Sequence, residues 1–546
     1  MTEAQSDISG APMVEPKDHA LGEPGLEMGI PGGPEDSGSE CTLEGIERRP
    51  LREILTVAAP SVVTMTSYTV MQFIDVLMVS RIGPEPVYVS AAGNGSIAAW
   101  LSIALPLGAA GVVNTFVSQN LGAGRPREGA GYVWTAVWLC ALWYLLAVLP
   151  FSFFAGTIFG WTGHDGELLR LEVPYAQIAL LGAGPILVSR TLQHYFYGMH
   201  RPNVVMIAAI AGNVVNLFAN AAFIFGPAGM PLGDGALSGV VRPFTEAAAW
   251  AAGWLGMHEG MGVVGAAWGT LAGGVVELAI PAALFLGGKY AREFGSRERW
   301  RPSGRRSLEL FRLGWPAGLM FLNELFCWSY LMVVLLPAAG EAAGEDPVVH
   351  NTAGWIALRY MHVSFMPAVG LSIAMTAVVG RCMGEKRPDL ASSRTWLGVR
   401  IALIYMGVCA LVFFTFRREL IGIFADSGLA PGEGAASAEA VIDVGARVMI
   451  AAAVFQLFDA VAITLTGALR GAGDTVFPGV ATIVLSWGCI VVGGHALIEL
   501  APGLGSVGPW IGGASYIMLL GVVLLVRFLS GKWKTMSVVQ EEPVSA

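Results

Sequence analysis

The sequence predicts an all-α membrane protein with twelve transmembrane helices in two six-helix bundles. Composition is the first reason: 54% of the 546 residues are hydrophobic, 13% are charged, and the mean hydropathy is +0.60, whereas a soluble protein carries about 25% charged residues. The second reason is that the apolar residues form runs of about 20 or more, the length with which a helix spans a bilayer. The third is a faint internal repeat that relates the two halves by a parallel pseudo-two-fold axis.

Each half of the chain contains six apolar runs that are long enough to cross a membrane. The predicted spans are 54–79, 87–113, 131–156, 173–196, 203–226, 261–287, 311–336, 349–379, 395–416, 441–466, 475–499 and 507–529. Because six is an even number, the two halves have the same orientation and both termini lie on one side. Transporters built from such parallel repeats commonly bind their substrate between the halves.

The internal repeat is visible in one pair of short segments and in one pair of prolines. The segment 122–126, Gly-Ala-Gly-Arg-Pro, follows the second span, and 384–388, Gly-Glu-Lys-Arg-Pro, follows the eighth, 262 residues later. Pro60 in the first span and Pro316 in the seventh lie 256 residues apart. The two offsets nearly agree, so the halves align with little drift.

Lysine and arginine residues are sorted between alternate loops. The stretch 288–312 alone contains eight of them. The loops on the opposite side contain only Arg81, Arg170, Arg242, Arg417 and Arg418. By the positive-inside rule we expect both termini in the cytoplasm, as in a multi-pass protein of the inner (cytoplasmic) cell membrane.

Three segments lie outside the spans. The predicted organisation is a disordered acidic cytoplasmic tail at 1–47, an N-terminal bundle at 48–288 with an outer insert at 227–260, a basic cytoplasmic linker at 289–307, a C-terminal bundle at 308–534 and a cytoplasmic tail at 535–546. The first 47 residues contain eleven Asp and Glu and little that could be buried. The insert is rich in Ala and Trp at its centre, so we expect a helix on the outer membrane surface, with a flexible insert as the alternative.

Glu324 and Asp459 are acids inside two predicted spans. Glu324 lies eight residues after Pro316, and Asp459 lies eight residues before Gly467. Both landmarks are at the cytoplasmic ends of their spans, so each acid lies roughly 12 Å along its helix from that end. If the two spans run in opposite directions, the acids lie at a similar depth. An ionised carboxylate in hydrocarbon usually faces a cavity and binds something, so the pair suggests a cation site. A salt bridge to Arg359 or Arg447, which also lie inside spans, is the alternative.

Asp75 is a third acid inside a span, in the outer half of the first one. Asn216 and Asn220 in the fifth span are four residues apart and therefore share a helix face. Two amide carbonyls and a carboxylate suit a hard cation or a hydrogen-bond network gated by a proton. The alternative is that the asparagines, with Asn213, only join helices.

Other polar and flexible residues have less distinctive patterns. Met361, Phe365 and Met366 in the eighth span could form an adaptable drug-binding surface in the central cleft, or could be ordinary helix packing. For Glu277 in the sixth span a structural role is favoured. Asp474 is expected to cap the start of the eleventh span.

Four segments share their order and spacing with a known family. They are 60–83 with Gln72-Phe-Ile-Asp75, 119–124 with Gln119-Asn-Leu-Gly122, 311–316 followed by Glu324, and 455–460 with Asp459 followed by 467–475. Together they resemble the multidrug and toxic compound extrusion (MATE) transporters, in their bacterial NorM-type branch. The resemblance spans about residues 48–534, outside the tail and the outer insert.

The resemblance implies a secondary active antiporter that exports organic cations and amphipathic xenobiotics by alternating access, in exchange for inward Na⁺ or H⁺. It implies coupling-cation roles for Glu324 and Asp459, as ligands of Na⁺, and for Asp75 in the other half. The implied partners are small-molecule drugs or toxic organic cations and the lipid bilayer. We expect a monomer, no nucleic acid and no cofactor beyond the coupling ion. The choice between Na⁺ and H⁺ stays open, with the pattern of acids favouring Na⁺.

A lipid-linked flippase of the same superfamily, moving envelope precursors, is the alternative function. Such flippases usually have an arginine-lined cavity, whereas here the arginines well inside the spans, Arg190, Arg359 and Arg447, are set against acids. An enzyme is not expected, because the sequence contains no HExxH, GxSxG or paired Asp/His cluster. The six cysteines show no metal-ligand spacing.

Overall fold

The computed structural model describes residues 49–539 except 84, 86, 162, 232–237 and 426–434. The predicted disordered tail at 1–47 lies outside the described residues. Within them all regular structure is helical, and 12 helical stretches are long and apolar enough to cross a membrane. The predicted fold class is therefore confirmed, and the chain is a multi-pass membrane protein.

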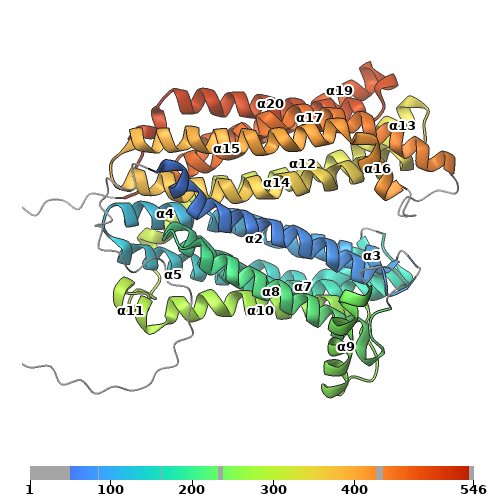
Figure 1. Ribbon diagram of the computed structural model, residues 1–546, viewed down its shortest axis with the longest axis horizontal. Helices are drawn as coiled ribbons and strands as arrows, with labels where there is room; N and C mark the ends of the chain where they lie inside the picture. The colour runs from blue at the N-terminus through green and yellow to red at the C-terminus, as the bar shows by residue number, and fades with distance from the viewer. Residues whose placement is uncertain are drawn as a thin grey trace, which may run out of the picture. The chain divides into compact units, whose positions relative to one another are not determined.

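The helices of the N-terminal half occupy one side of the view in Figure 1 and those of the C-terminal half the other. The first half contains α2 (Pro50–Val79), α3 (Val87–Ala110), α4 (Val112–Gly122), α5 (Pro126–Trp143), a π-helical turn (Tyr144–Val148), α6 (Leu149–Trp161), α7 (Gly166–Gly198), α8 (Pro202–Phe225), a 3-10 turn (Gly226–Ala228), α9 (Ser238–Trp254), α10 (Val263–Leu286) and α11 (Gly288–Phe294). The second half contains α12 (Gly304–Tyr330), a π-helical turn (Leu331–Leu335), α13 (Leu336–Ala343), α14 (Pro347–Gly384), α15 (Pro388–Thr415), α16 (Arg417–Ala425), α17 (Ala435–Ala472), α18 (Val476–Ser486), a π-helical turn (Trp487–Val492), α19 (Gly493–Leu500), a 3-10 turn (Pro502–Leu504), α20 (Val507–Leu529) and a 3-10 turn (Lys532–Thr535).

One turn recurs at four equivalent places and makes the internal repeat visible. It joins α4 to α5 and α7 to α8 in the first half, and α14 to α15 and α17 to α18 in the second. Each turn contains a residue with positive φ, and the next N–H donates to a carbonyl five residues back, a common way to end a helix. The positive-φ residues are Gly124, His200, Lys386 and Gly473. Proline then begins the following helix in three of the four cases.

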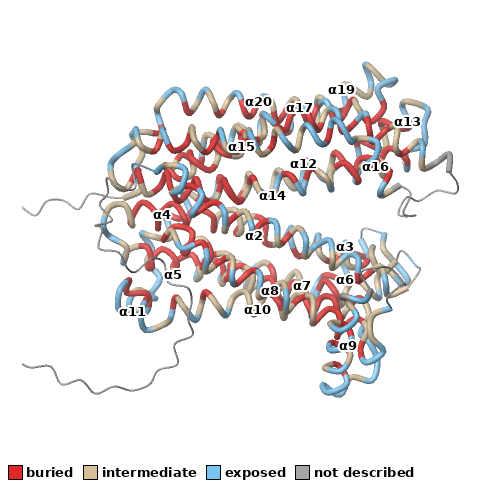
Figure 2. The backbone as a smooth tube through the Cα atoms, in the orientation of Figure 1, coloured by how far each residue is buried: buried red, intermediate tan, exposed pale blue. Residues whose placement is uncertain are grey.

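Helix packing repeats in the same way. In the first half α7 packs against both α3 and α10, and in the second half its counterpart α17 packs against both α14 and α20. Buried residues line the inner faces of the helices in both halves (Figure 2). Large apolar side chains such as Phe153, Leu146 and Ile404 are more than 70% exposed, as expected where a helix faces lipid rather than water.

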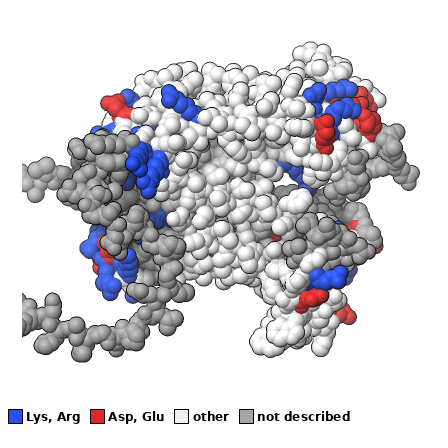
Figure 3. Space-filling model, viewed as in Figure 1, with Lys and Arg blue, Asp and Glu red and all other residues white. Residues whose placement is uncertain are grey.

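Charged side chains gather at the two ends of the helices and leave an apolar band between them (Figure 3). We call the end that carries the stretch 288–312 the basic end. The predicted linker there is fastened to the bundle, because Arg299 and Arg306 both form ion pairs with Glu128 on α5. The expectation that Asp474 caps the eleventh span is wrong: its carboxylate pairs with Arg527 at 2.7 Å, and α18 starts after Thr475 without a side-chain cap.

Candidate functional site

Asp75 on α2 is joined to two asparagines on α8. The amide of Asn220 donates to Asp75 Oδ1 at 2.7 Å and to Asn216 Oδ1 at 3.3 Å. Asn216 continues the chain to Thr270 Oγ1 on α10 at 3.4 Å. The structure thus brings the three predicted N-terminal residues into one network, while Asn213 bonds Ser67 on α2 instead.

One hydrogen-bond acceptor in the network of Asp75, Asn216 and Asn220 has no partner among the described residues. Asn220 is 0% exposed, and its Oδ1 atom has no hydrogen-bond partner. Asp75 is only partly buried. A carboxylate beside an unpaired carbonyl oxygen can receive a proton or an oxygen-seeking cation.

Two glycines on α10 allow this network to form. A methyl group on Gly269 would overlap Asn220 Oδ1, and one on Gly273 would lie 2.7 Å from Asn216 Cβ. The glycines are four residues apart, like the asparagines that they face. Small residues at this spacing let membrane helices approach closely.

Sequence reasoning missed a second polar cluster in the same half. Glu277 on α10 accepts hydrogen bonds from Tyr68 on α2 and, at 2.5 Å, from Gln193 on α7. Arg190 lies 3.6 Å from the same carboxylate and stacks over the Tyr68 ring. The charges of Arg190 and Glu277 therefore balance, and the signal for this pairing was an arginine and an acid inside spans of the same half.

The C-terminal acids lie on two different helices that face a third. Tyr516 on α20 donates to Glu324 Oε1 on α12 at 2.9 Å. Asp459 on α17 is close enough to interact electrostatically with both Glu324 and Tyr516. The structure therefore places the two acids near each other, on different helices. Arg359 and Arg447, the alternative partners, are both exposed.

No group of three or more His, Cys, Asp or Glu side chains close enough to hold a metal ion occurs in the described part of the chain. Glu324 and Asp459 nevertheless provide carboxylate oxygens, and Tyr516 adds a hydroxyl oxygen. Such a donor set suits a hard cation such as Na⁺ rather than a soft transition metal.

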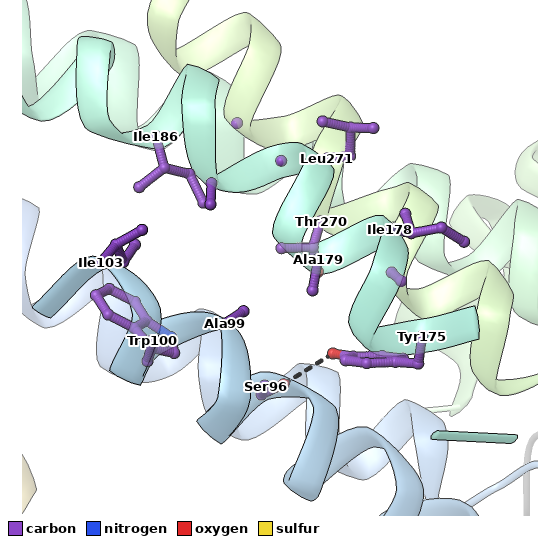
Figure 4. A pocket seen from close by; sticks show the side chains of 14 residues that line it. Ser96, Ala99, Trp100, Ile103, Tyr175, Ile178, Ala179, Ile186, Thr270 and Leu271 are labelled. Atoms are coloured by element: carbon purple, nitrogen blue, oxygen red, sulfur yellow. Dashed lines mark hydrogen bonds between the residues drawn. The ribbon is translucent and has the colours of Figure 1, made fainter. Parts of the chain in front are cut away.

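A cavity of about 70 Å³ lies inside the N-terminal half, between α3, α7 and α10 (Figure 4). Its walls are mostly Ala, Ile and Leu side chains, with Trp100 at one side. Ser96 and Tyr175 share a hydrogen bond of 2.9 Å across it. Thr270 lines the cavity and also ends the Asp75 network, so an apolar space adjoins the polar chain.

The three predicted cleft residues on α14 have different environments. Met361 is 7% exposed and belongs to the core of the C-terminal half. Met366 packs at the contact between the halves, in a cluster with Met65 and Tyr68 of α2. Phe365 is 37% exposed and is the one of the three with an open face.

The two halves are joined at the basic end by side chains of α4. Asn114 donates to Ile373 O at 3.1 Å, Thr115 to Arg470 O at 2.9 Å and Gln119 to Gly471 O at 2.9 Å. Gln119 also accepts from Val538 N at 3.0 Å, which ties down the chain after α20.

An ion pair at the basic end and a hollow in the surface toward the other end show where the two halves are in contact. Arg394 on α15 pairs with Glu53 on α2 at 2.8 Å. Toward the other end, the surface is hollowed between the halves (Figure 3). The conformation is therefore closed between the halves at the basic end.

The comparison with a protein-family model matches one stretch in each half of the chain. A family model described as MatE matches residues 60–222 and 320–493. The multidrug resistance protein PmpM of Pseudomonas aeruginosa is 27% identical over 82% of this chain and 84% of its own length. A probable multidrug resistance protein NorM of Thermotoga maritima is 27% identical over 78% of this chain and 82% of its own.

A solved structure shows the same fold. It is described as the outward-facing conformation of a multidrug resistance MATE family transporter of the MOP superfamily, and it matches with a TM-score of 0.74. The match covers 89% of this chain and 97% of that one, at 21% identity.

Proposed function

The chain belongs to the MatE family, and we propose that it is a secondary active antiporter that exports organic cations and amphipathic xenobiotics in exchange for inward Na⁺ or H⁺. The observation that carries the proposal is a carboxylate site within the spans of each half, at Asp75 and at Glu324 with Asp459. A charge at the centre of a spanning helix costs roughly 2.5–3.5 kcal/mol on insertion scales, so such residues usually serve an ion or substrate. The names of the relatives point to drugs as the cargo.

The orientation follows from charge. We propose that the basic end faces the cytoplasm of a bacterial-type inner membrane, with both termini on that side. The conformation described here would then be closed to the cytoplasm and open to the outside. Rocking of the two halves about the central cleft would break the α4 contacts and expose the cleft to the cell interior.

Coupling would arise from competition for the carboxylates. A bound Na⁺ or proton neutralises the acids, and a cationic drug is then held less tightly. By linkage each ligand lowers the affinity for the other. We propose Na⁺ as the ion at Glu324 and Asp459, since the site offers oxygen atoms from three side chains, and a proton or cation at Asp75 beside the free Asn220 carbonyl.

The flippase alternative receives less support from the site. An anionic lipid-linked precursor needs cationic side chains that are free to bind it. Arg190 is neutralised by Glu277 and covered by the Tyr68 ring. The carboxylates of Glu324 and Asp459 favour a cationic cargo, and the arginine that interacts electrostatically with Glu324, Arg470, is itself partly buried.

The test uses purified protein reconstituted in vesicles that contain ethidium. An inward Na⁺ gradient and an inward proton gradient are applied in separate experiments, and ethidium efflux is followed by fluorescence. We expect one of the two gradients to drive efflux against the ethidium gradient, with Na⁺ as the favoured ion. Efflux that is unchanged after both gradients are collapsed would contradict an antiporter. Uptake of a lipid-linked precursor without ethidium transport would support the flippase.

A further inference from the structure

The helix α9 lies outside the residues that the MatE model matches, and the proposed transport cycle gives it no role. It follows α8 at the end of the helices opposite the basic end. Figure 1 shows it running across the direction of the spanning helices. A helix with this orientation at the end of a bundle lies along a membrane surface rather than through the bilayer.

The inner face of α9 is fixed to the N-terminal half. Thr245, Ala248 and Ala252 follow a helical spacing and are 4%, 0% and 0% exposed. The two alanines share a buried cluster with residues of α8. The ring of Phe244 also packs edge-on against Phe218 of α8, with 5.6 Å between centroids. The helix therefore has a defined outer face.

The outer face of α9 carries two large aromatic side chains. Trp250 and Trp254 are one helical turn apart and are 74% and 77% exposed. Glu246 and Arg242 lie one and two turns before Trp250 along the same ridge, so charge gives way to aromatic surface toward the end of the helix. A Trp ring has an apolar body and a polar N–H group, which suits the boundary between headgroups and acyl chains.

Tryptophans on neighbouring elements lie at the same end of the molecule. Trp161 ends α6 and is 82% exposed, and Trp268 lies in the second turn of α10 and is 39% exposed. Below them, α8 presents exposed apolar residues such as Val214 along its span. The outer face of α9 thus continues the lipid-facing surface at the level where aromatic residues mark the membrane interface.

The net charge of the segment 238–262 indicates whether it would bind anionic or neutral lipid headgroups. Among the described residues 238–262 one Arg stands against two Glu, a formal charge of −1 with His neutral. Electrostatic attraction to anionic headgroups therefore contributes nothing net, and the contact depends on burying aromatic surface. We propose that α9 is an interfacial anchor that inserts Trp250 and Trp254 into the headgroup region of this leaflet, zwitterionic lipids included. Because α9 packs on α8, the anchor holds the N-terminal half at a fixed depth.

Photochemical crosslinking tests this contact directly. A benzophenone side chain is placed at position 250, or at position 242 as a matched control on the same ridge, and the full-length protein is irradiated in phosphatidylcholine vesicles. We expect lipid adducts in the intact mass spectrum at position 250 and markedly fewer at 242. The yield should not change with added phosphatidylglycerol or with salt. Covalent dimers in place of lipid adducts, or equal yields at the two positions, would overturn the proposal.

A second measurement keeps the proposal testable if the photoreactive residue disturbs folding. The double variant Trp250→Ser/Trp254→Ser is compared with Glu246→Ser on the same helix, each in phosphatidylcholine nanodiscs and each with a defined melting curve. We expect a lower melting temperature for the Trp variant only, because it alone loses surface inserted in the bilayer. Equal melting temperatures for the two variants would contradict an anchor.

Discussion

Single residues decide how closely the helices of the N-terminal site approach. Gly269→Ala would place a methyl group on Asn220 Oδ1, which forces Asn220 away from Asp75 or α10 away from α8. We expect a loss of about 1–3 kcal/mol in stability, typical of overpacking, and slower efflux. Gly93→Ala is the control, because its methyl group would meet nothing within 4 Å. Melting curves and ethidium efflux should change for the first variant alone.

Asp75→Asn removes a charge and keeps the shape of the side chain. The amide oxygen can still accept from Asn220, so we expect the protein to fold. Efflux should fall about tenfold or more, because losing a coupling charge removes at least about 1.4 kcal/mol of ion-binding free energy. Ion binding at Glu324 and Asp459 should persist, as measured by calorimetry. Wild-type efflux by this variant would exclude Asp75 from coupling.

At the scale of helices, α4 holds the basic end closed. Gln119→Ala would remove the bonds to Gly471 O and from Val538 N, worth about 1 kcal/mol each. We expect the population open at the basic end to rise about 5- to 30-fold, measured as distances between spin labels on the two halves. Asn120→Ala is the matched control, since the side chain of Asn120 donates within α4, to Phe116 O. Equal distances in the two variants would contradict this role.

The turn between α7 and α8 adds a dependence on pH. Burial, with the charge of Arg381, lowers the pKa of His200 to about 4, against the hydrogen bond with Ala377 O. The neutral ring therefore stabilises the closed end fully above pH 6.5, and this contribution is lost as the pH falls toward 4. We expect acid to open the basic end less in His200→Asn, which tolerates positive φ. Spin-label distances between about pH 7 and pH 4.5 check this, and identical titrations would refute it.

Patterns along the sequence predict the helices better than they predict their contacts. Spans, repeat and family follow from apolar runs and turn residues, which are local. Asp75, Asn216 and Asn220 were also placed together, because spacing of four residues defines a helix face. The pairing of Glu277 with Arg190 and the burial of Met361 depend on which helix lies opposite, and no local pattern records that. Asp474 failed as a cap for the same reason, since Arg527 comes from a distant helix.

At the scale of the whole molecule, the proposed transport cycle requires the two halves to move relative to each other, and segments outside the spans should not be needed for it. The sequence 1–47 contains eleven Asp and Glu and no apolar run of the length that crosses a membrane, so we expect deletion of residues 2–45 to leave efflux unchanged at matched protein levels. A large loss of efflux would instead give the tail a role in the cycle. By contrast, the chain after α20 contacts α4 through Val538, and it belongs to the closed end.

Gradient-driven ethidium efflux by the double variant Glu324→Gln/Asp459→Asn tests the central claim most directly. The amides keep the size of both side chains and remove both charges, so the protein should fold and lose coupled export. Asp443→Asn is the control on the same helix, because Asp443 pairs with Arg418 outside the site, and it should transport normally. Full coupled efflux by the double variant, at protein levels equal to those of the control, would contradict the account.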